Sequence, residues 1–139
     1  ASVVCHVAAA HPHIQAVVTD SVYARFFPVM RRVIQQRYHI PLPGAWLTWA
    51  GLHMALRIRL ASHDPIVVAS HLRQPLLAIH GGLDQRVLPA WGQAFYQRWS
   101  GPKEQWMDPA IGHVKMFANY PELYCRRVGE FFDRTLTAS

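Results

Sequence analysis

Short apolar runs alternate with longer helix-compatible stretches along this chain. The clearest run, PLLAIH at Pro75–His80, starts on a proline and ends on Gly81 and Gly82, and it predicts a strand. A second strand is predicted over Ile14–Thr19, where the short apolar run suits burial on both faces, and a third over Lys103–Met107. Because strands and helices alternate, we expect an α/β fold with about three parallel strands and helices packed on both faces of the sheet.

Helix-compatible spacing surrounds these strands. It covers residues 1–10, Pro89–Trp99 and Asn119–Leu136, and the last of these stretches is amphipathic. Its predicted inward side chains are Leu123, Val128, Phe131, Phe132 and Leu136, and its outward ones are Glu122, Arg126, Arg127 and Asp133. We therefore expect this final helix to cover one face of the sheet.

Val22–His63 has a different pattern, in which prolines interrupt aromatic and basic residues, and it predicts helical pieces. Within it, Gly44–Leu60 is apolar almost all round, which predicts a helix that other elements cover. The run falls short of a bilayer-spanning stretch because three polar residues interrupt it: His53, Arg57 and Arg59. A transmembrane helix is therefore not expected.

The chain has a formal net charge of +6, from 14 Lys and Arg against 8 Asp and Glu. Such a surplus of positive charge could favour binding to a nucleic acid or to an anionic membrane. However, the basic residues are scattered from Arg25 to Arg134, and the densest runs, 31–37 and 57–59, lack a groove-reading motif. We therefore expect no nucleic-acid partner.

The sequence predicts no metal ion and no other cofactor. The histidines that a metal site would draw on show no spacing typical of a closed site: His11, His13, His63, His71 and His80. We expect His80, at the end of a strand, to pack near the chemistry without acting. Cys5 and Cys125 are too few for a disulfide framework, and since both fall in helical stretches we expect buried thiols.

An acid and an imidazole follow the second and third predicted strands. Asp84 comes after Gly81 and Gly82, and His113 comes after Gly112. Because the carboxyl ends of parallel strands meet at one edge of the sheet, the two side chains can lie within hydrogen-bond reach. The acid would then set the tautomer of an imidazole that moves protons.

Other readings of these acids stay open at this stage. Asp84 could be an ordinary turn former after a strand. Asp20, which also follows a strand, is an alternative acid, whereas Asp108 is expected to be a turn residue.

The sequence here resembles a known family. PLLAIHGGLDQRVLP looks like the strand and loop that carry the triad acid of α/β-hydrolases, and GPKEQWMDPAIGHVKMF looks like the final strand and loop that carry the triad histidine. PELYCRRVGEFFDRTL resembles that family's last helix. The resemblance implies that Asp84 is the acid and His113 the base, although Ile111 stands where a small residue is usual.

The resemblance also extends to the first residues of the chain. AAAHPHIQAVVTDS is similar to the helix and strand that follow the nucleophile elbow, which implies that the elbow serine and the oxyanion hole lie before Ala1. Ser2 lacks the flanking glycines of an elbow, and the side chains of Cys5 and His6 diverge on a helix. We therefore expect an inactive isolated chain, whose parent domain hydrolyses ester, thioester or amide bonds of a small molecule.

Three parts follow from this comparison: 1–21 after the elbow, 22–73 as a helical cap-like insertion, and 74–139 with the acid and histidine. In the insertion, an apolar acyl or leaving-group pocket is implied for Phe26, Phe27, Trp46 and Trp49. The stripe with Trp46 and Trp49 could instead bind lipid, but packing is the default.

Two further expectations concern partners. The non-enzymatic alternative is a truncated hydrolase-fold module that binds a ligand or a protein. The strand within Ile14–Thr19 would lack a central partner strand, so self-association through its exposed edge is also expected.

Overall fold

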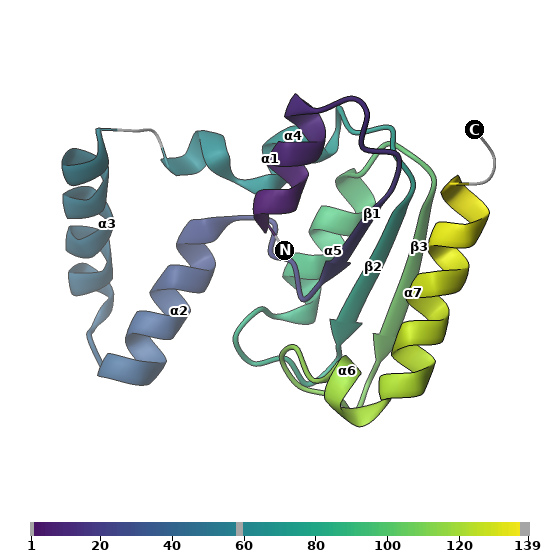
Figure 1. The fold of residues 1–139 in the computed structure, drawn as a ribbon. Coiled ribbons are helices and arrows are strands. Elements are labelled where there is room, and N and C mark those ends of the chain that lie inside the picture. The colour runs from purple at the N-terminus through teal and green to yellow at the C-terminus, as the bar shows by residue number, and fades with distance from the viewer. Residues whose placement is uncertain (1, 58–59, 137–139) are drawn as a thin grey trace.

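The fold is known from a computed structural model, which describes residues 2–57 and 60–136. Its centre is a sheet of three parallel strands, β1 Val17–Asp20, β2 Leu76–Gly81 and β3 Lys103–Asp108, in the order β1-β2-β3 (Figure 1). The register pairs Asp20 with Ile79 and Gly81 with Asp108. This confirms the expected parallel sheet, and it brings the residues after all three strands to one edge.

The middle strand is buried on both faces because its apolar side chains alternate between two cores. Leu76 and Ala78 belong to a core on the side of α1 Ser2–Ala10, α4 Pro65–Ala69 and α5 Pro89–Arg98. Leu77 and Ile79 belong to the core on the side of α7. The run of β2 is continuously apolar because both of its faces are buried.

The expected last helix consists of two pieces. α6 Met116–Asn119 ends at Tyr120, and α7 Pro121–Leu136 begins with a proline and the first-turn acid Glu122. Four of the five predicted inward side chains lie in the core: Leu123, Val128, Phe131 and Phe132. The prediction for Leu136 is wrong, because it lies in the last turn, beyond these core contacts, and is 45% exposed.

The segment between β1 and α4 forms a helical hairpin that projects beside the sheet, with α2 between α3 and the sheet (Figure 1). α2 Phe26–Tyr38 ends at His39, whose φ of 53° is left-handed, and α3 Leu42–Leu56 follows directly. We call residues 26–56 the α2–α3 hairpin. A short 3-10 turn, η1 Leu60–His63, then leads into α4.

α3 differs from the expected helix over Gly44–Leu60. It ends at Leu56, where Arg57 turns left-handed, and Ile58 lies outside the described residues. The expectation that other elements cover it is wrong. Ala45 is its only described buried residue, because α2 covers one side alone. Within residues 2–57 and 60–136, no helix is long and apolar enough to span a bilayer.

Candidate active site

The loop after β2 holds Asp84 in a fixed position. Two glycines let this loop pass close to the loop after β3, since a Cβ on Gly81 would lie 2.4 Å from the carbonyl oxygen of Ile111. The Asp84 side chain is fully buried, and its Oδ1 accepts the backbone N–H groups of Arg86 and Val87 at 2.9 and 2.8 Å. One carboxylate oxygen is therefore fixed by the loop, which leaves the other for a partner.

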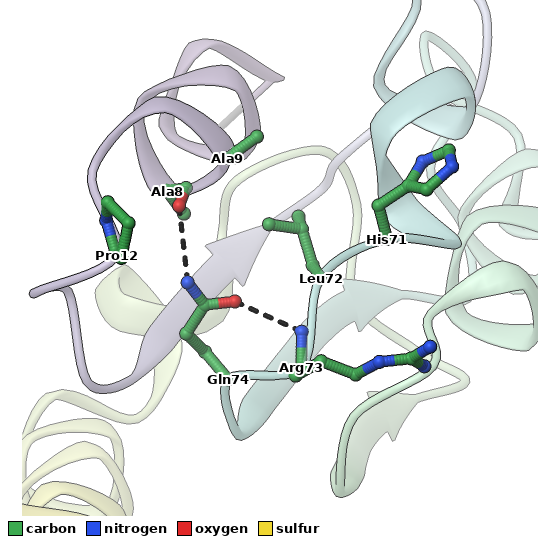
Figure 2. A pocket seen from close by; sticks show the side chains of 7 residues that line it. All are labelled: Ala8, Ala9, Pro12, His71, Leu72, Arg73 and Gln74. Atoms are coloured by element: carbon green, nitrogen blue, oxygen red, sulfur yellow. Dashed lines mark hydrogen bonds between the residues drawn. The ribbon is translucent and has the colours of Figure 1, made fainter.

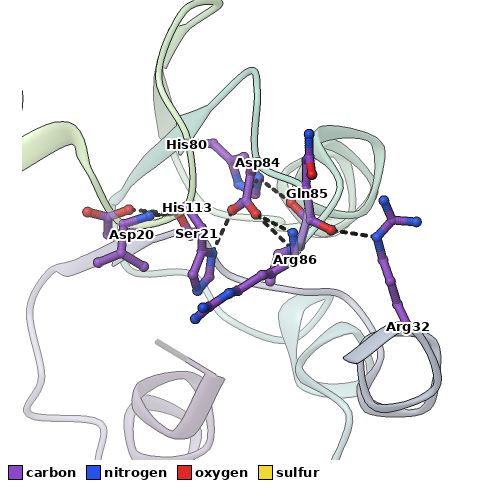
Figure 3. A network of polar contacts seen from close by, with 10 residues as sticks. Asp20, Ser21, Arg32, His80, Asp84, Gln85, Arg86 and His113 are labelled. Atoms are coloured by element: carbon purple, nitrogen blue, oxygen red, sulfur yellow. Dashed lines mark hydrogen bonds and ion pairs between the residues drawn. The ribbon is translucent and has the colours of Figure 1, made fainter. Parts of the chain in front are cut away.

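That partner is His113, in the loop after β3. Its Nδ1 lies 2.7 Å from Oδ2 of Asp84, and the ring is partly exposed, with 28% of the side chain accessible (Figure 3). Beside a carboxylate acceptor, Nδ1 carries the proton and donates it, which leaves Nε2 as the basic nitrogen. The structure thus brings together the two residues that the sequence singled out.

The end of β1 supports the histidine loop from the other side. Ser21 and Val114 have left-handed φ values of 53° and 51°, and the N–H of Val114 donates to Oγ of Ser21 at 3.3 Å. A left-handed valine is strained, because its branched side chain disfavours that region. Ser21 and Val114 therefore help to position His113. Sequence reasoning missed both, because the contact joins segments far apart in the chain.

Asp20 and Asp108 have other partners. Asp20 accepts hydrogen bonds from the hydroxyls of Ser21 and Tyr124, at 3.0 and 3.4 Å, and burial raises its pKa above the ordinary value. Asp108 accepts the N–H of Ala110 at 2.8 Å, as a turn residue does, and also the hydroxyl of Tyr120. The direct carboxylate partner of His113 is therefore Asp84.

His80 packs under the acid loop. It is buried at the end of β2, where its Nε2 donates to the carbonyl oxygen of Val87 at 3.0 Å and lies 3.7 Å from Oδ2 of Asp84. Gly92 of α5 leaves room for the ring, because a Cβ there would lie 2.5 Å from Nδ1 of His80. His80 thus stabilises the loop that carries Asp84.

A hollow of about 360 Å³ opens beside His113. We call it the site hollow. Its lining comes from the start of α1, the end of β1, α2 and the two site loops: Ser2, Asp20, Ser21, Tyr23, Val29, Val33, Arg86, Val87, His113 and Val114. The volume is within the range of small-molecule sites.

The four aromatic residues expected to form a pocket contact one another through their rings, and the Phe26 and Trp49 centroids lie 6.2 Å apart. Phe26 borders a neighbouring hollow of about 370 Å³. Phe27 packs between Trp46 and Trp49, with ring centroids 4.5 and 5.0 Å apart, and so joins α2 to α3. The α2 side chains at the site hollow are instead Val29 and Val33.

One hydrogen bond connects the hairpin to the acid loop. The guanidinium Nε of Arg32, on α2, donates to the carbonyl oxygen of Gln85, the residue after Asp84 (Figure 3). The α2–α3 hairpin is therefore hydrogen-bonded to the loop that carries Asp84.

Another hollow, of about 480 Å³, lies at the opposite end of the strands. Its lining, shown in Figure 2, is Ala8, Ala9, Pro12, His71, Leu72, Arg73 and Gln74. Gln74 crosses it and donates to the carbonyl oxygen of Ala8 at 3.2 Å. This hollow contains no carboxylate beside its histidine, so the acid–imidazole pair marks the other end as the candidate active site.

The cysteines differ from each other in environment. Cys5 is buried as expected, and burial raises its pKa to about 12, which keeps it a thiol. The expectation of a buried thiol is wrong for Cys125, which is exposed on the outer side of α7. Among the described residues, no three of the His, Cys, Asp and Glu side chains come together as metal ligands would.

Solved structures with the same fold are found by comparison of coordinates. An esterase of Pyrococcus furiosus superposes with a TM-score of 0.71 at 23% identity, over 97% of this chain and 50% of its own. The esterase domain of a Rhodothermus marinus protein gives 0.69 at 19% identity, over 96% and 55%. An α/β hydrolase from a lagoon-sediment metagenome gives 0.63 at 16% identity, over 96% and 57%.

These matches are in structure rather than in sequence. No family model matches the sequence, and no curated protein does. The chain spans about half the length of the solved structures that it matches. Its three parallel strands, with helices on both faces, therefore have a partial α/β-hydrolase fold.

Proposed function

We propose that this protein hydrolyses ester, thioester or amide bonds of a small molecule through an acyl-enzyme. The observation that carries the proposal is the 2.7 Å contact between Nδ1 of His113 and the fully buried carboxylate of Asp84, at the edge of the site hollow. A buried acid paired with a partly exposed imidazole is the arrangement that general-base chemistry requires. The esterases among the structural matches support the same reaction class.

In this reaction His113 moves the protons. Its Nε2 takes the proton of a serine hydroxyl as the serine oxygen attacks the carbonyl carbon, and it returns that proton to the leaving group as the acyl-enzyme forms. Water then attacks the acyl group, with His113 again as base and serine as the leaving group. Asp84 stays ionised and stabilises the imidazolium in each step.

We place the nucleophile on an elbow that precedes residue 1 in the parent domain. The start of α1 is the support for this, because Ser2 lines the site hollow together with His113. The described alternatives are poor nucleophiles. The hydroxyl of Ser2 donates to the hydroxyl of Tyr23 at 2.9 Å, and the buried Cys5 stays protonated.

The substrate's acyl or leaving group would occupy the site hollow. Val29 and Val33 of α2 supply an apolar wall there, and Phe26 borders the adjoining hollow. We propose that Phe27, Trp46 and Trp49 act indirectly, since their packing between α2 and α3 holds that wall in place.

Fluorophosphonate labelling tests this proposal. The parent protein should react at a serine within a G-x-S-x-G elbow, and His113→Ala should slow the reaction by about 10³-fold or more. His71→Ala, at the opposite end of the strands, is the matched control and should react normally.

The 139-residue chain is the second control. It should take up no label, because the proposed nucleophile lies outside it. Labelling of this chain at Ser2, or labelling of His113→Ala at the normal rate, would refute the proposal.

A further inference from the structure

The net charge of the chain is concentrated in the insertion. Arginine is the only charged residue type between Asp20 and Asp64, at Arg25, Arg31, Arg32, Arg37, Arg57 and Arg59. Outside this segment the remaining Lys and Arg equal the Asp and Glu in number, so the whole +6 resides here. The basic residues are scattered along the chain, but the acidic residues that would balance them are missing from one segment.

The same segment exposes an apolar helix face. α3 has no charged residue over Leu42–Leu56. Leu47 and Met54, seven positions apart and so on one side of the helix, are 73% and 76% exposed, and Trp46 beside Leu47 is 54% exposed. The Thr48 hydroxyl donates to the carbonyl oxygen of Gly44, so it adds little polarity. We call Trp46, Leu47 and Met54 the α3 stripe.

The hairpin can present this stripe without disturbing the sheet. α3 stands at the outer side of the molecule, with α2 between it and the sheet (Figure 1). Arg31 and Arg37 are exposed on α2, and Arg57 is exposed at the end of α3. Apolar and cationic side chains therefore occur together on one projecting unit.

We propose that the α2–α3 hairpin docks onto an anionic lipid surface. The α3 stripe would lie at the boundary between headgroups and acyl chains, and the arginines would contact lipid phosphates. This arrangement is interfacial, so it requires no spanning helix. Trp46 packs against Phe27 on one side and is 54% exposed, so it can contribute to such a surface while it also joins α2 to α3.

Charge complementarity favours lipid over the two other kinds of occupant. A second copy of this segment would bring more arginines and no carboxylate to pair with them. A nucleic acid could bind the arginines, but the α3 stripe offers it a single polar group, the indole N–H of Trp46, because Leu47 and Met54 have no hydrogen-bond donor. A lipid surface satisfies the apolar and the cationic groups together.

Vesicle flotation tests the proposal. The chain should float with vesicles of phosphatidylcholine mixed with phosphatidylglycerol, should bind vesicles of phosphatidylcholine alone more weakly, and should dissociate as salt rises. Arg31→Gln and Arg37→Gln should each weaken binding to the mixed vesicles by roughly fivefold. Leu47→Glu combined with Met54→Glu should abolish it.

A matched control and a second measurement keep the test interpretable. Leu136→Glu, a charge change at an exposed leucine of α7, should bind normally. A blue shift of tryptophan fluorescence on adding mixed vesicles, which Trp46→Phe should reduce, reports docking without a destabilising change. Because neither readout requires hydrolysis, failure of the catalytic proposal would leave this result unaffected.

Three outcomes would overturn the proposal. The first is that the chain binds both kinds of vesicle equally, or binds neither. A second is self-association that the Leu47→Glu and Met54→Glu pair abolishes without any lipid binding, which would make a second copy the occupant. The third is tight binding to a DNA or RNA oligonucleotide with no flotation.

Discussion

Oδ2 of Asp84 lies 2.7 Å from Nδ1 of His113, while Oδ1 of the same carboxylate accepts two backbone N–H groups of its own loop. The acid is thus oriented by its loop before it contacts the imidazole. Because the side chain is fully buried, its charge acts on His113 with little screening by solvent.

Asp84→Asn should lower kcat for ester hydrolysis by the parent protein by about 10⁴-fold, with KM little changed. The amide carries no charge to stabilise the imidazolium, and it can favour the wrong tautomer of His113. Steady-state hydrolysis of a chromogenic ester measures this. Asp108→Asn, in the neighbouring turn, should stay within a few-fold of wild type, and equal losses in the two variants would contradict the assignment.

Val33→Phe should reduce kcat/KM for long acyl chains more than for acetyl. The larger side chain would fill part of the site hollow, which Val33 lines. A series of esters of increasing acyl length measures the effect. Val67→Phe, at a partly exposed valine of α4, is the size-matched control. An unchanged chain-length profile for Val33→Phe would show that the site hollow does not receive the acyl group.

Gly92→Ala should destabilise the fold by about 1–3 kcal/mol, because the new methyl group would overlap the buried His80 ring. Gly129→Ala, also within a helix, has open space around it and should stabilise by roughly 0.5–1 kcal/mol. Urea unfolding of both variants checks the opposite signs. A stabilised Gly92→Ala would mean that His80 can move aside.

The contribution of Asp20 to the free energy of unfolding should fall as pH rises. Burial raises the pKa of Asp20 above its ordinary value of 3.8, so the folded state binds this proton more tightly than the unfolded state does. The free energy of unfolding should therefore fall as pH rises from 3.8 through the raised pKa.

Urea midpoints measured across this pH range test the contribution of Asp20. Burial also raises the pKa of Asp64, so the comparison is wild type minus Asp20→Asn, in which the Asp64 contribution cancels. The difference should change with pH in the window above 3.8. Parallel curves would show that Asp20 has the same pKa in both states.

The 139-residue chain should self-associate through β1, as the resemblance to α/β-hydrolases implied. In the described sheet β1 pairs with β2 alone, so the backbone groups along its other edge have no strand partner. Sedimentation velocity over a range of concentrations measures this association. A monodisperse monomer with a cooperative melt would be the contrary result.

The sequence by itself determined the strands and the candidate acid and base. The run in β2 is apolar because that strand is buried on both faces, and such burial leaves a local signature in composition. Asp84 and His113 each follow a strand and a glycine, so local turn chemistry placed them at one edge of a parallel sheet.

Tertiary structure alone decided the contacts around this pair. Ser21 contacts Val114, and Gly92 leaves room for His80, although these residues lie on segments distant in the chain. The exposure of α3 likewise depends on which distant elements pack against it. An apolar helix has the same local pattern whether or not a partner covers it, so only the packing showed that α2 covers one side of α3. The spacing of apolar residues indicates that a helix face is apolar. Which element packs against that face depends on the path of the whole chain.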